Sequence, residues 1–518
     1  MLRRVYLILS LSILCVFALQ AQEERLYLPV NAEFNNVRLD SALNILEKET
    51  DLYFTYDASK VPVDNIIKAS FNYIPLSVVL DSIINDPYLV YQLIDKQLVI
   101  YSADIPEEEN KSINSQDVDL LEDEQILIEG RILDLETKMN LPFVNIGIKS
   151  KSIGTISNEN GGFLLKVKRS MLNDTIAFSY MGYKSNYIVI KDYIPNSDIY
   201  LEPNVIPLQE VVIRSTDPKS LIRYAIQSRK DNYSNNASLL RCFYREVLTR
   251  NKRYKMYTEG LLDVYKSPYR PTLFTDQIKL LKRRTFSNLV AEDTVQFKLQ
   301  GGLKTSLDLD IVKYPMEFIH PSTLNTYIYT LSDIVTYDDR LLYQIDFRPY
   351  QSGDKPGFEG SLYIDVVNLA IVRVSFRYTP KSLKAVKNDF VLRKSRAIKV
   401  TITNAEYDIT YKLQDGRYYI SRIYGSVKTR VKKRRKFLAS NFETSFELVT
   451  TDIHTENIER FKRKETLRPN RIFSEIDSEY DRKFWNGDNF VLPEKDLTKA
   501  LNRFKTEELK INGNQTGN

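Results

Sequence analysis

The chain has 518 residues, which is enough for about three domains. Charged residues make up 27% of it and hydrophobic residues 43%, a globular composition that excludes disorder along the whole length. The formal net charge of +6 is small for this length, and no nucleic-acid partner is expected.

The first residues, 1–21, have the pattern of a signal peptide. Arg3 and Arg4 precede an apolar run over residues 5–19, which is shorter than a typical membrane-spanning helix. Cleavage is expected between Ala21 and Gln22. The sequence therefore predicts an exported protein.

Two cysteines are present, and one of them, Cys15, lies in the predicted signal peptide. Leu14 stands where lipid attachment to a cysteine needs a small residue, so a lipoprotein is the less favoured form. Once the signal is removed, Cys242 is the only cysteine left, which excludes a disulfide within the mature chain. Cys242 is expected to be a packed, small apolar residue.

Residues 22–103 are expected to form a small βαβ-type domain with two similar halves. The predicted elements are an amphipathic helix over 37–46, a strand over 52–56, a second helix over 75–84, and strands over 90–93 and 98–101. This arrangement resembles the secretin and TonB short N-terminal domain. The resemblance implies a periplasmic module that docks onto other envelope proteins, such as an anti-sigma regulator or a TonB-system component. An unrelated small α/β domain is the alternative.

Residues 104–125 are predicted to be a linker. They carry repeated carboxylates, including Glu107-Glu108-Glu109 and Glu122-Asp123-Glu124, and few large apolar residues. Like charges repel one another and resist compaction, so a solvated acidic spacer is expected.

Residues 126–202 show short alternating apolar runs separated by Gly, Pro and Asn, which predict a small antiparallel β-sandwich of seven-stranded type. The runs at 141–146, 158–163 and 178–183 resemble the carboxypeptidase-regulatory-like domain at the front of many Bacteroidetes outer-membrane proteins. The resemblance implies an interaction module, not a peptidase, and a periplasmic or outer-membrane-associated location. Asn158 is a departure, because the family usually has Asp there.

Residues 203–217 are expected to be a connector. They include Leu208-Gln209-Glu210-Val211-Val212-Ile213, a closing signature that in nutrient-uptake receptors often leads into a transporter plug.

Residues 218–518 are predicted to form a large antiparallel β-rich domain with some helix. A helix is expected to begin at Asp217-Pro218, with Asp as its cap, and Asp415-Gly416 predicts a tight hairpin turn. A meander of strands is expected over 341–349, 360–365 and 370–378. This pattern loosely resembles the curved sheet of periplasmic lipoprotein carriers.

A membrane barrel is an alternative for this last part. The 305 residues after Ile213 are too few for a plug and a 22-stranded receptor barrel, although a smaller outer-membrane barrel fits by length. Many Lys and Arg residues at alternate positions favour a soluble sheet with helix cover.

Catalytic signatures are missing from the sequence. The two histidines, His320 and His454, stand in unrelated contexts, and no nucleophile elbow or phosphate-binding glycine loop is found. We therefore expect no catalytic residue, no metal ligand and no cofactor. An envelope hydrolase acting on glycan or peptide through carboxylates in residues 218–518 is the alternative.

One run of cations stands out. Seven of the nine residues from Lys428 to Lys436 are Lys or Arg. Lys432, Lys433, Arg434 and Arg435 are the predicted contacts to an anion, such as a lipid phosphate or an acidic glycan. The alternative is a solvated hairpin end, where charge protects against aggregation.

These features together predict a non-enzymatic envelope protein that binds a partner or ligand. Its front domains would dock to other envelope proteins, and its β-rich remainder would bind a ligand or another protein.

Overall fold

The computed structural model describes the chain in segments. They are residues 29–56, 61–84, 89–94, 96–102, 125–204, 217–270, 274–287, 298–299, 302–350, 357–386, 391–393, 398–433, 439–468, 471–476, 485, 488–495 and 497–500. The predicted cleavage site Ala21–Gln22 and nearly all of the predicted acidic linker lie outside them. Contacts divide the chain into two compact units, Met1–Asn114 and Ser115–Asn518. No helix in the described segments is long and apolar enough to cross a membrane.

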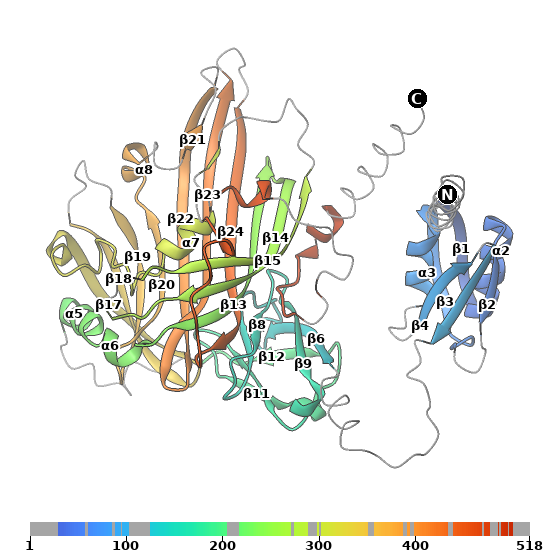
Figure 1. The fold of residues 1–518 in the computed structure, drawn as a ribbon, viewed down its shortest axis with the longest axis horizontal. Coiled ribbons are helices and arrows are strands. Elements are labelled where there is room, and N and C mark those ends of the chain that lie inside the picture. Colours follow the sequence, from blue (N-terminus) through green and yellow to red (C-terminus); the bar gives the residue numbers. More distant parts are fainter. Residues whose placement is uncertain are drawn as a thin grey trace, which may run out of the picture. The chain divides into compact units, whose positions relative to one another are not determined.

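The described residues of the first unit form two helices and two small sheets (Figure 1). Its elements are β1 (Pro29–Arg38), α2 (Leu39–Thr50), β2 (Tyr53–Tyr56), β3 (Ile66–Pro75), α3 (Leu76–Ile84), β4 (Leu89–Ile94) and β5 (Gln97–Ser102). β1 pairs with β3, and β5 lies between β2 and β4, parallel to β2. Both predicted helices are confirmed, beginning one or two residues later than expected, and α2 buries its predicted apolar stripe against the core.

The second unit begins with a sandwich of two sheets. Its strands are β6 (Gln125–Asp134), β7 (Asn145–Ile148), β8 (Gly154–Ile156), β9 (Gly162–Lys168), β10 (Thr175–Ser179), β11 (Asn186–Val189) and β12 (Asp198–Leu201). One sheet has the order β11-β10-β7-β8 and the other β12-β6-β9. All pairs are antiparallel except β12 and β6, which are parallel and correct the expectation of a purely antiparallel sandwich. Gly161 makes a tight turn at φ +75°, where a Cβ would lie 2.5 Å from the Ile132 carbonyl oxygen.

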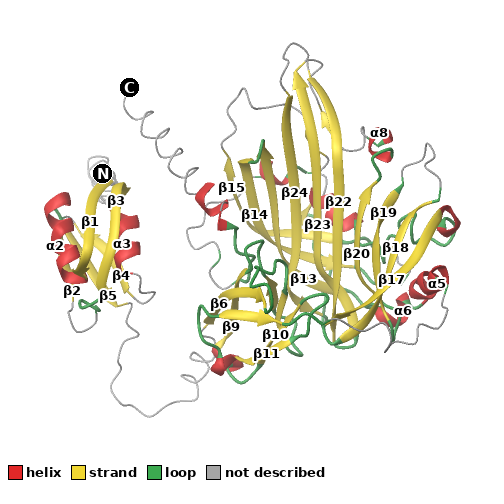
Figure 2. Cartoon of the chain, turned by 180° about the vertical axis from the view of Figure 1, so that it is seen from behind, coloured by secondary structure: helices red, strands yellow, loops and turns green. Residues whose placement is uncertain are grey.

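An antiparallel sheet of eleven strands forms the rest of this unit (Figures 1 and 2). Its strands are β13 (Ser238–Arg250), β14 (Arg253–Lys266), β15 (Gln277–Ser287), β17 (Tyr327–Tyr337), β18 (Arg340–Pro349), β19 (Phe358–Asp365), β20 (Ile371–Tyr378), β22 (Ile398–Gln414), β23 (Arg417–Lys433), β24 (Ala439–His454) and β25 (Thr466–Leu467). Their order is β17-β18-β19-β20-β22-β23-β24-β13-β14-β15-β25. The predicted large antiparallel sheet, its meander β18-β19-β20 and the hairpin β22–β23 are confirmed.

Helices accompany the sheet. They are α5 (Pro218–Gln227), α6 (Arg229–Asn232), α7 (Gly302–Asp308) and α8 (Ser382–Ala385). α5 begins as predicted, because the Asp217 carboxylate accepts hydrogen bonds from the backbone N–H groups of Lys219 and Ser220, and Pro218 occupies the first turn.

The two faces of the large sheet differ in composition. We call the side of Tyr244 and Leu448 the inner face, and the side of Arg245 and Glu447 the outer face; in each pair the two residues lie directly opposite on β13 and β24. The inner face carries the main apolar core. The segment after α7 completes it with Leu309, Ile311, Val312, Phe318 and Ile319, all buried. The chain's own side chains therefore cover the apolar surface of this face.

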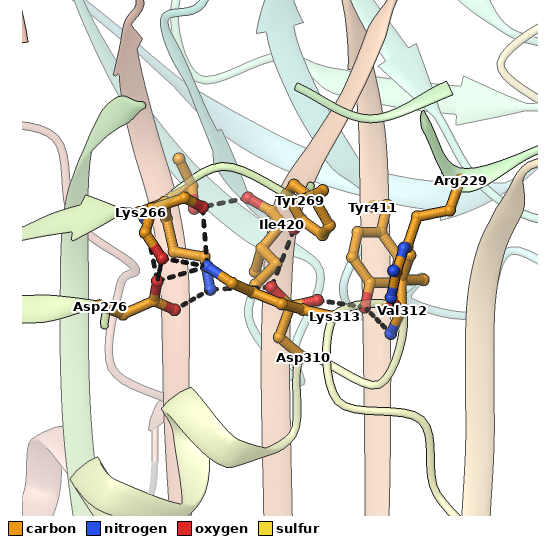
Figure 3. A network of polar contacts seen from close by, with 11 residues as sticks. Arg229, Lys266, Tyr269, Asp276, Asp310, Val312, Lys313, Tyr411 and Ile420 are labelled. Atoms are coloured by element: carbon orange, nitrogen blue, oxygen red, sulfur yellow. Dashed lines mark hydrogen bonds and ion pairs between the residues drawn. The ribbon is translucent and has the colours of Figure 1, made fainter. Parts of the chain in front are cut away.

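A buried polar network fixes that segment to the sheet (Figure 3). The Lys266 ammonium at the end of β14 lies 2.5 Å from Asp276 Oδ2 and 2.8 Å from Asp310 Oδ2. The Lys313 ammonium donates to Asp276 and to the backbone and hydroxyl oxygens of Ser267, at 2.6–2.7 Å.

Two tyrosines complete the network from the sheet side. The hydroxyls of Tyr269 and Tyr411 each donate to Asp310 at 2.9 Å. Burial raises the pKa of Asp276, but the attraction of Lys266 and Lys313 outweighs this and lowers it to about 2. Two ammonium groups and two carboxylates, all of them buried, thus neutralise one another.

We predict that Asp310→Asn lowers the free energy of unfolding by about 3–5 kcal/mol, because Lys266 would keep only one of its two carboxylates in a buried site. Asp308→Asn is the matched control. Its carboxylate is exposed and pairs only with Lys304 one helical turn away, so the loss should be roughly 0.5 kcal/mol or less. Urea unfolding of both variants measures the difference, and similar losses would contradict the structural role of the network.

A second buried acid lies on the inner face of β13. Glu246 is 8% exposed and accepts a hydrogen bond of 2.7 Å from the Tyr244 hydroxyl. Gly302 of α7 lies against the same hydroxyl, because a Cβ there would be 2.5 Å from it. Burial raises the pKa of Glu246 to about 7.

This acid makes stability depend on pH. The pKa of Glu246 is higher in the folded chain than in the unfolded one, where it is about 4.3. Its contribution is therefore complete below pH 4.3 and lost as the pH rises through 7. We predict that wild type loses roughly 2–4 kcal/mol more than Glu246→Gln between pH 4.5 and pH 8. Urea unfolding across this range tests it, with exposed Glu136→Gln as the control; parallel curves for wild type and Glu246→Gln would contradict the assignment.

Candidate anion-binding face

The described part of the cation run that the sequence singled out, residues 428–433, lies on β23, between two other long strands, β22 and β24. β22, β23 and β24 extend farther than their neighbours in both ribbon views (Figures 1 and 2). β22 and β23 meet at the turn Asp415–Gly416, whose two residues have φ of 49° and 74°, as a type I′ turn requires. Their other ends, at 398–404 and 428–433 with 439–443 of β24, form what we call the tip.

The tip has one buried side and one exposed side. Lys428, Arg430 and Lys432 are exposed, while Thr429 and Val431 between them are buried. On the buried side Val400, Val431 and Phe442 form a small core with Leu248. Because side chains alternate along a strand, all the exposed cations point to the outer face of the sheet. We call this exposed side the tip face; its described residues are Lys399, Thr401, Asn404, Lys428, Arg430, Lys432, Asn441 and the partly exposed carboxylate Glu443.

The strand register places a further cation on the tip face. Lys399 of β22 lies directly opposite Lys432 of β23, and Arg430 lies opposite Thr401. Like charges directly opposite in a sheet repel, at a cost of roughly 0.2–1 kcal/mol. Within the described part of the chain, Lys399, Arg430 and Lys432 have no ion pair. The nearest carboxylate contact is between Glu443 and Lys428, at 3.5 Å. Of the described cations of the tip face, Lys428 is therefore paired with Glu443, whereas Lys399, Arg430 and Lys432 have no carboxylate partner among the described residues.

The predicted anion contacts fall here in part. Lys432 is exposed on the tip face. Lys433 ends β23, and its backbone is paired with Ile398, but its side chain is outside the description. Arg434 and Arg435 lie outside the described residues.

Sequence reasoning missed Lys399, although a signal existed. Lys399 stands 16 residues before Asp415, and Lys432 stands 16 residues after Gly416. Counting outward from the predicted turn would have paired them. Two bulges, at 402/404 and 410/411, cancel in the register and leave this count correct.

The outer face beyond the tip has the opposite character, because its cations are paired. Arg245 lies 2.7 Å from Glu447 and 3.0 Å from Glu494, and Arg422 lies 2.6 Å from Glu447. Burial raises the pKa of Glu447, but Arg245 and Arg422 outweigh it and lower that pKa.

The sandwich covers this paired layer. The Arg422 guanidinium lies 4.1 Å from the centre of the Phe143 ring, a cation–π contact between the sheet and the sandwich. The C-terminal segment adds to the contact, where Asn489 exchanges two hydrogen bonds with the backbone of Lys166 on β9. Arg245 and Arg422 in this part of the face thus form contacts within the folded chain, unlike Lys399, Arg430 and Lys432 of the tip face.

Neither histidine joins a cluster of ligands. His320 contacts Ser322, and His454 Nε2 lies 3.5 Å from an Asp452 oxygen. The segments that the structure describes contain no group of three His, Cys, Asp or Glu side chains able to hold a metal ion. Cys242 is buried, which raises the pKa of its thiol to about 12 and makes it a poor nucleophile.

His454 does line a cavity of about 300 Å³ between the sandwich and the sheet. Its walls are Ser150, Lys151, Ser152, Ile153, Gln414, Asp415, Asp452, Ile453, His454 and Thr455. The Ser152 hydroxyl donates to Asp452, not to the imidazole. This orientation does not activate the serine as a nucleophile.

The described carboxylate pairs are also unlike a hydrolytic site. Asp276 and Asp310 are bridged by Lys266, and Glu447 and Glu494 are bridged by Arg245. Glu246 has the raised pKa of a general acid, but its side chain is buried and accepts a hydrogen bond from Tyr244. These groups serve the fold.

Comparison with known proteins supports one part of the chain. Residues 128–213 match the family model of the CarboxypepD_reg-like domain, which confirms the predicted carboxypeptidase-regulatory-like domain in this region. No curated protein matches the chain significantly.

Solved structures show only remote likeness. A DUF1329 family protein from Desulfovibrio piger is 14% identical, with 47% of this chain and 95% of that chain covered and a TM-score of 0.19. A structure described as an outer membrane lipoprotein-sorting protein domain from Vibrio parahaemolyticus is 10% identical, with coverage of 46% and 93% and a TM-score of 0.19. Lipovitellin is 8% identical over 43% of this chain and 26% of its own, with a TM-score of 0.21. Such scores carry no argument about function.

Proposed function

We propose that this chain is a non-enzymatic cell-envelope binding protein that presents its tip face to an anionic partner. The observation that carries the proposal is the pair Lys399 and Lys432, which lie opposite one another with no carboxylate partner among the residues that the structure describes. A purely structural sheet end gains nothing from this repulsion, whereas an anion placed over both ammonium groups removes it. The match of residues 128–213 to the CarboxypepD_reg-like domain, together with the export pattern of residues 1–21, supports an envelope location.

The rest of the second unit supports this role by holding the tip rigid. The three tip strands are hydrogen-bonded along their length, and the small core of Val400, Val431 and Phe442 backs them. The sandwich is attached to the same face near Arg422, away from the tip. Charged side chains on rigid elements lose less entropy when they bind.

The front unit has a separate proposed role. We assign it the docking of other envelope proteins, such as an anti-sigma regulator or a TonB-system component. The resemblance of its two halves to the secretin and TonB short N-terminal domain supports this assignment, and its observed order of helices and strands is compatible with it.

An envelope hydrolase is the competing function. It would need two carboxylates free to act on a substrate as acid and base. Since the described pairs are bridged by Lys266 and Arg245, the binding function is favoured.

We predict that Lys399→Glu has opposite effects on stability and binding. The new carboxylate would face Lys432, so the free energy of unfolding should rise by roughly 0.2–1 kcal/mol. Affinity for immobilised polyphosphate should fall roughly tenfold or more, since each cation near an anionic surface contributes about 1 kcal/mol. Urea unfolding and surface plasmon resonance measure the two effects.

The control is Arg223→Glu, which makes the same change in net charge on the exposed side of α5. Its affinity for polyphosphate should stay within about twofold of wild type, because screening limits the reach of a surface charge to about 10 Å at 0.1 M salt. An equal loss of affinity in both variants would mean that only the net charge of the chain matters, which would contradict a specific role of the tip face. An unchanged affinity in Lys399→Glu would contradict the proposed function.

A further inference from the structure

We infer that the anionic partner of the tip face is the phosphate-bearing surface of a lipid bilayer. The inference rests on the proposed function, that the tip face binds anions, and adds the source of the anion. It depends on the shape, the composition and the position of the tip face.

Shape is the first argument. The cations stand on a hydrogen-bonded ladder, so their spacing is set by the strands: side chains two residues apart lie about 6.5–7 Å from one another, and neighbouring strands lie about 4.8 Å apart. The 300 Å³ cavity described in the structure has other walls, at the opposite end of β24. A folded protein partner must match such a surface in shape, whereas lipid headgroups can move sideways until their phosphates meet the cations.

Composition is the second argument. Thr401 and Asn441 lie among the cations and add neutral hydrogen-bond donors suited to phosphate oxygens. No aromatic side chain is among the described residues of the tip face. Ring-bearing polyanions such as nucleic acids are bound with the help of aromatic stacking, which this surface does not offer.

Position is the third argument. β22, β23 and β24 reach beyond the neighbouring strands (Figures 1 and 2). The sandwich contacts the sheet near Lys412, Arg422 and Asp452, toward the other end of these strands. Within the second unit, the tip can therefore approach a plane without the sandwich intervening.

Vesicle co-sedimentation of the full mature chain tests the inference. Vesicles of phosphatidylcholine alone are compared with vesicles in which about 30% of the lipid is phosphatidylglycerol, at about 0.1 M and about 0.5 M salt. We expect binding only to the anionic vesicles and its loss at high salt, because the Debye length shortens. The double variant Lys399→Gln, Lys432→Gln should bind roughly tenfold or more weakly.

The matched control is the double variant Arg223→Gln, Lys230→Gln, which removes two charges from exposed positions on α5 and α6. It should bind within about twofold of wild type. Urea unfolding of both double variants shows that each is folded. If Lys399→Gln, Lys432→Gln binds anionic vesicles as well as wild type does, the tip face is not the membrane contact.

A parallel measurement with soluble polyphosphate separates the two proposals. Binding of polyphosphate without binding of anionic vesicles would overturn the lipid inference and leave the proposed function standing. Binding of neither would overturn both. Binding of anionic vesicles that soluble polyphosphate displaces, with the loss confined to Lys399→Gln, Lys432→Gln, would support both.

Discussion

The buried network around Lys266 and Asp310 is the constraint on which the large sheet depends. An eleven-stranded sheet has two faces to cover, and the inner one is covered by a segment that has little regular structure of its own. Apolar contacts are not directional, so they alone would not fix the position of this segment on the inner face of the sheet. Ion pairs in a solvent-free site fix it, since Lys266 and Lys313 each need Asp276 and would be stranded by any shift. Because the chain itself covers that face, the binding proposed above uses the outer face.

The outer face shows two ways of treating charge on one surface. Under the sandwich, the buried arginines that strand alternation sends outward are paired with a carboxylate: Arg245 and Arg422 share Glu447 at the sandwich–sheet junction. At the tip the same alternation continues, but Lys399 and Lys432 meet each other. A hairpin that needed charge only to avoid aggregation could alternate lysine with glutamate and gain stability from the pairs. This contrast between paired cations under the sandwich and unpaired described cations at the tip is what the proposed binding function rests on.

Local patterns in the sequence predicted the local parts of this structure. The apolar stripe of α2, the cap at Asp217 and the turn Asp415–Gly416 are set by residues within a few positions of one another. The core of the candidate site was predictable for a similar reason, because Lys432 belongs to a contiguous run. Pairings over long distances were not predictable. Arg245 meets Glu447 because β13 and β24 are neighbours, and no short motif encodes that neighbourhood. The parallel pairing of β12 with β6 was not predictable either. The alternation of apolar and polar residues along an edge strand is the same whether the strand pairs in parallel or antiparallel.

Lys399 lies between these two cases. It lies outside the run 428–436, just after Arg393, Lys394 and Arg396, and only the register of the hairpin places it opposite Lys432. Its role follows from an energy difference: one substitution to glutamate would turn a repulsive pair into an attractive one. At this sheet end the repulsive pair is kept, and the hydrogen-bonded strands hold both ammonium groups in place. In the proposed function, the two charges are therefore preorganised for an anion. An anion that contacts both ammonium groups would be attracted by both charges, and little side-chain entropy would be lost on binding. Preorganisation of this kind would allow a surface without a pocket to bind an anion.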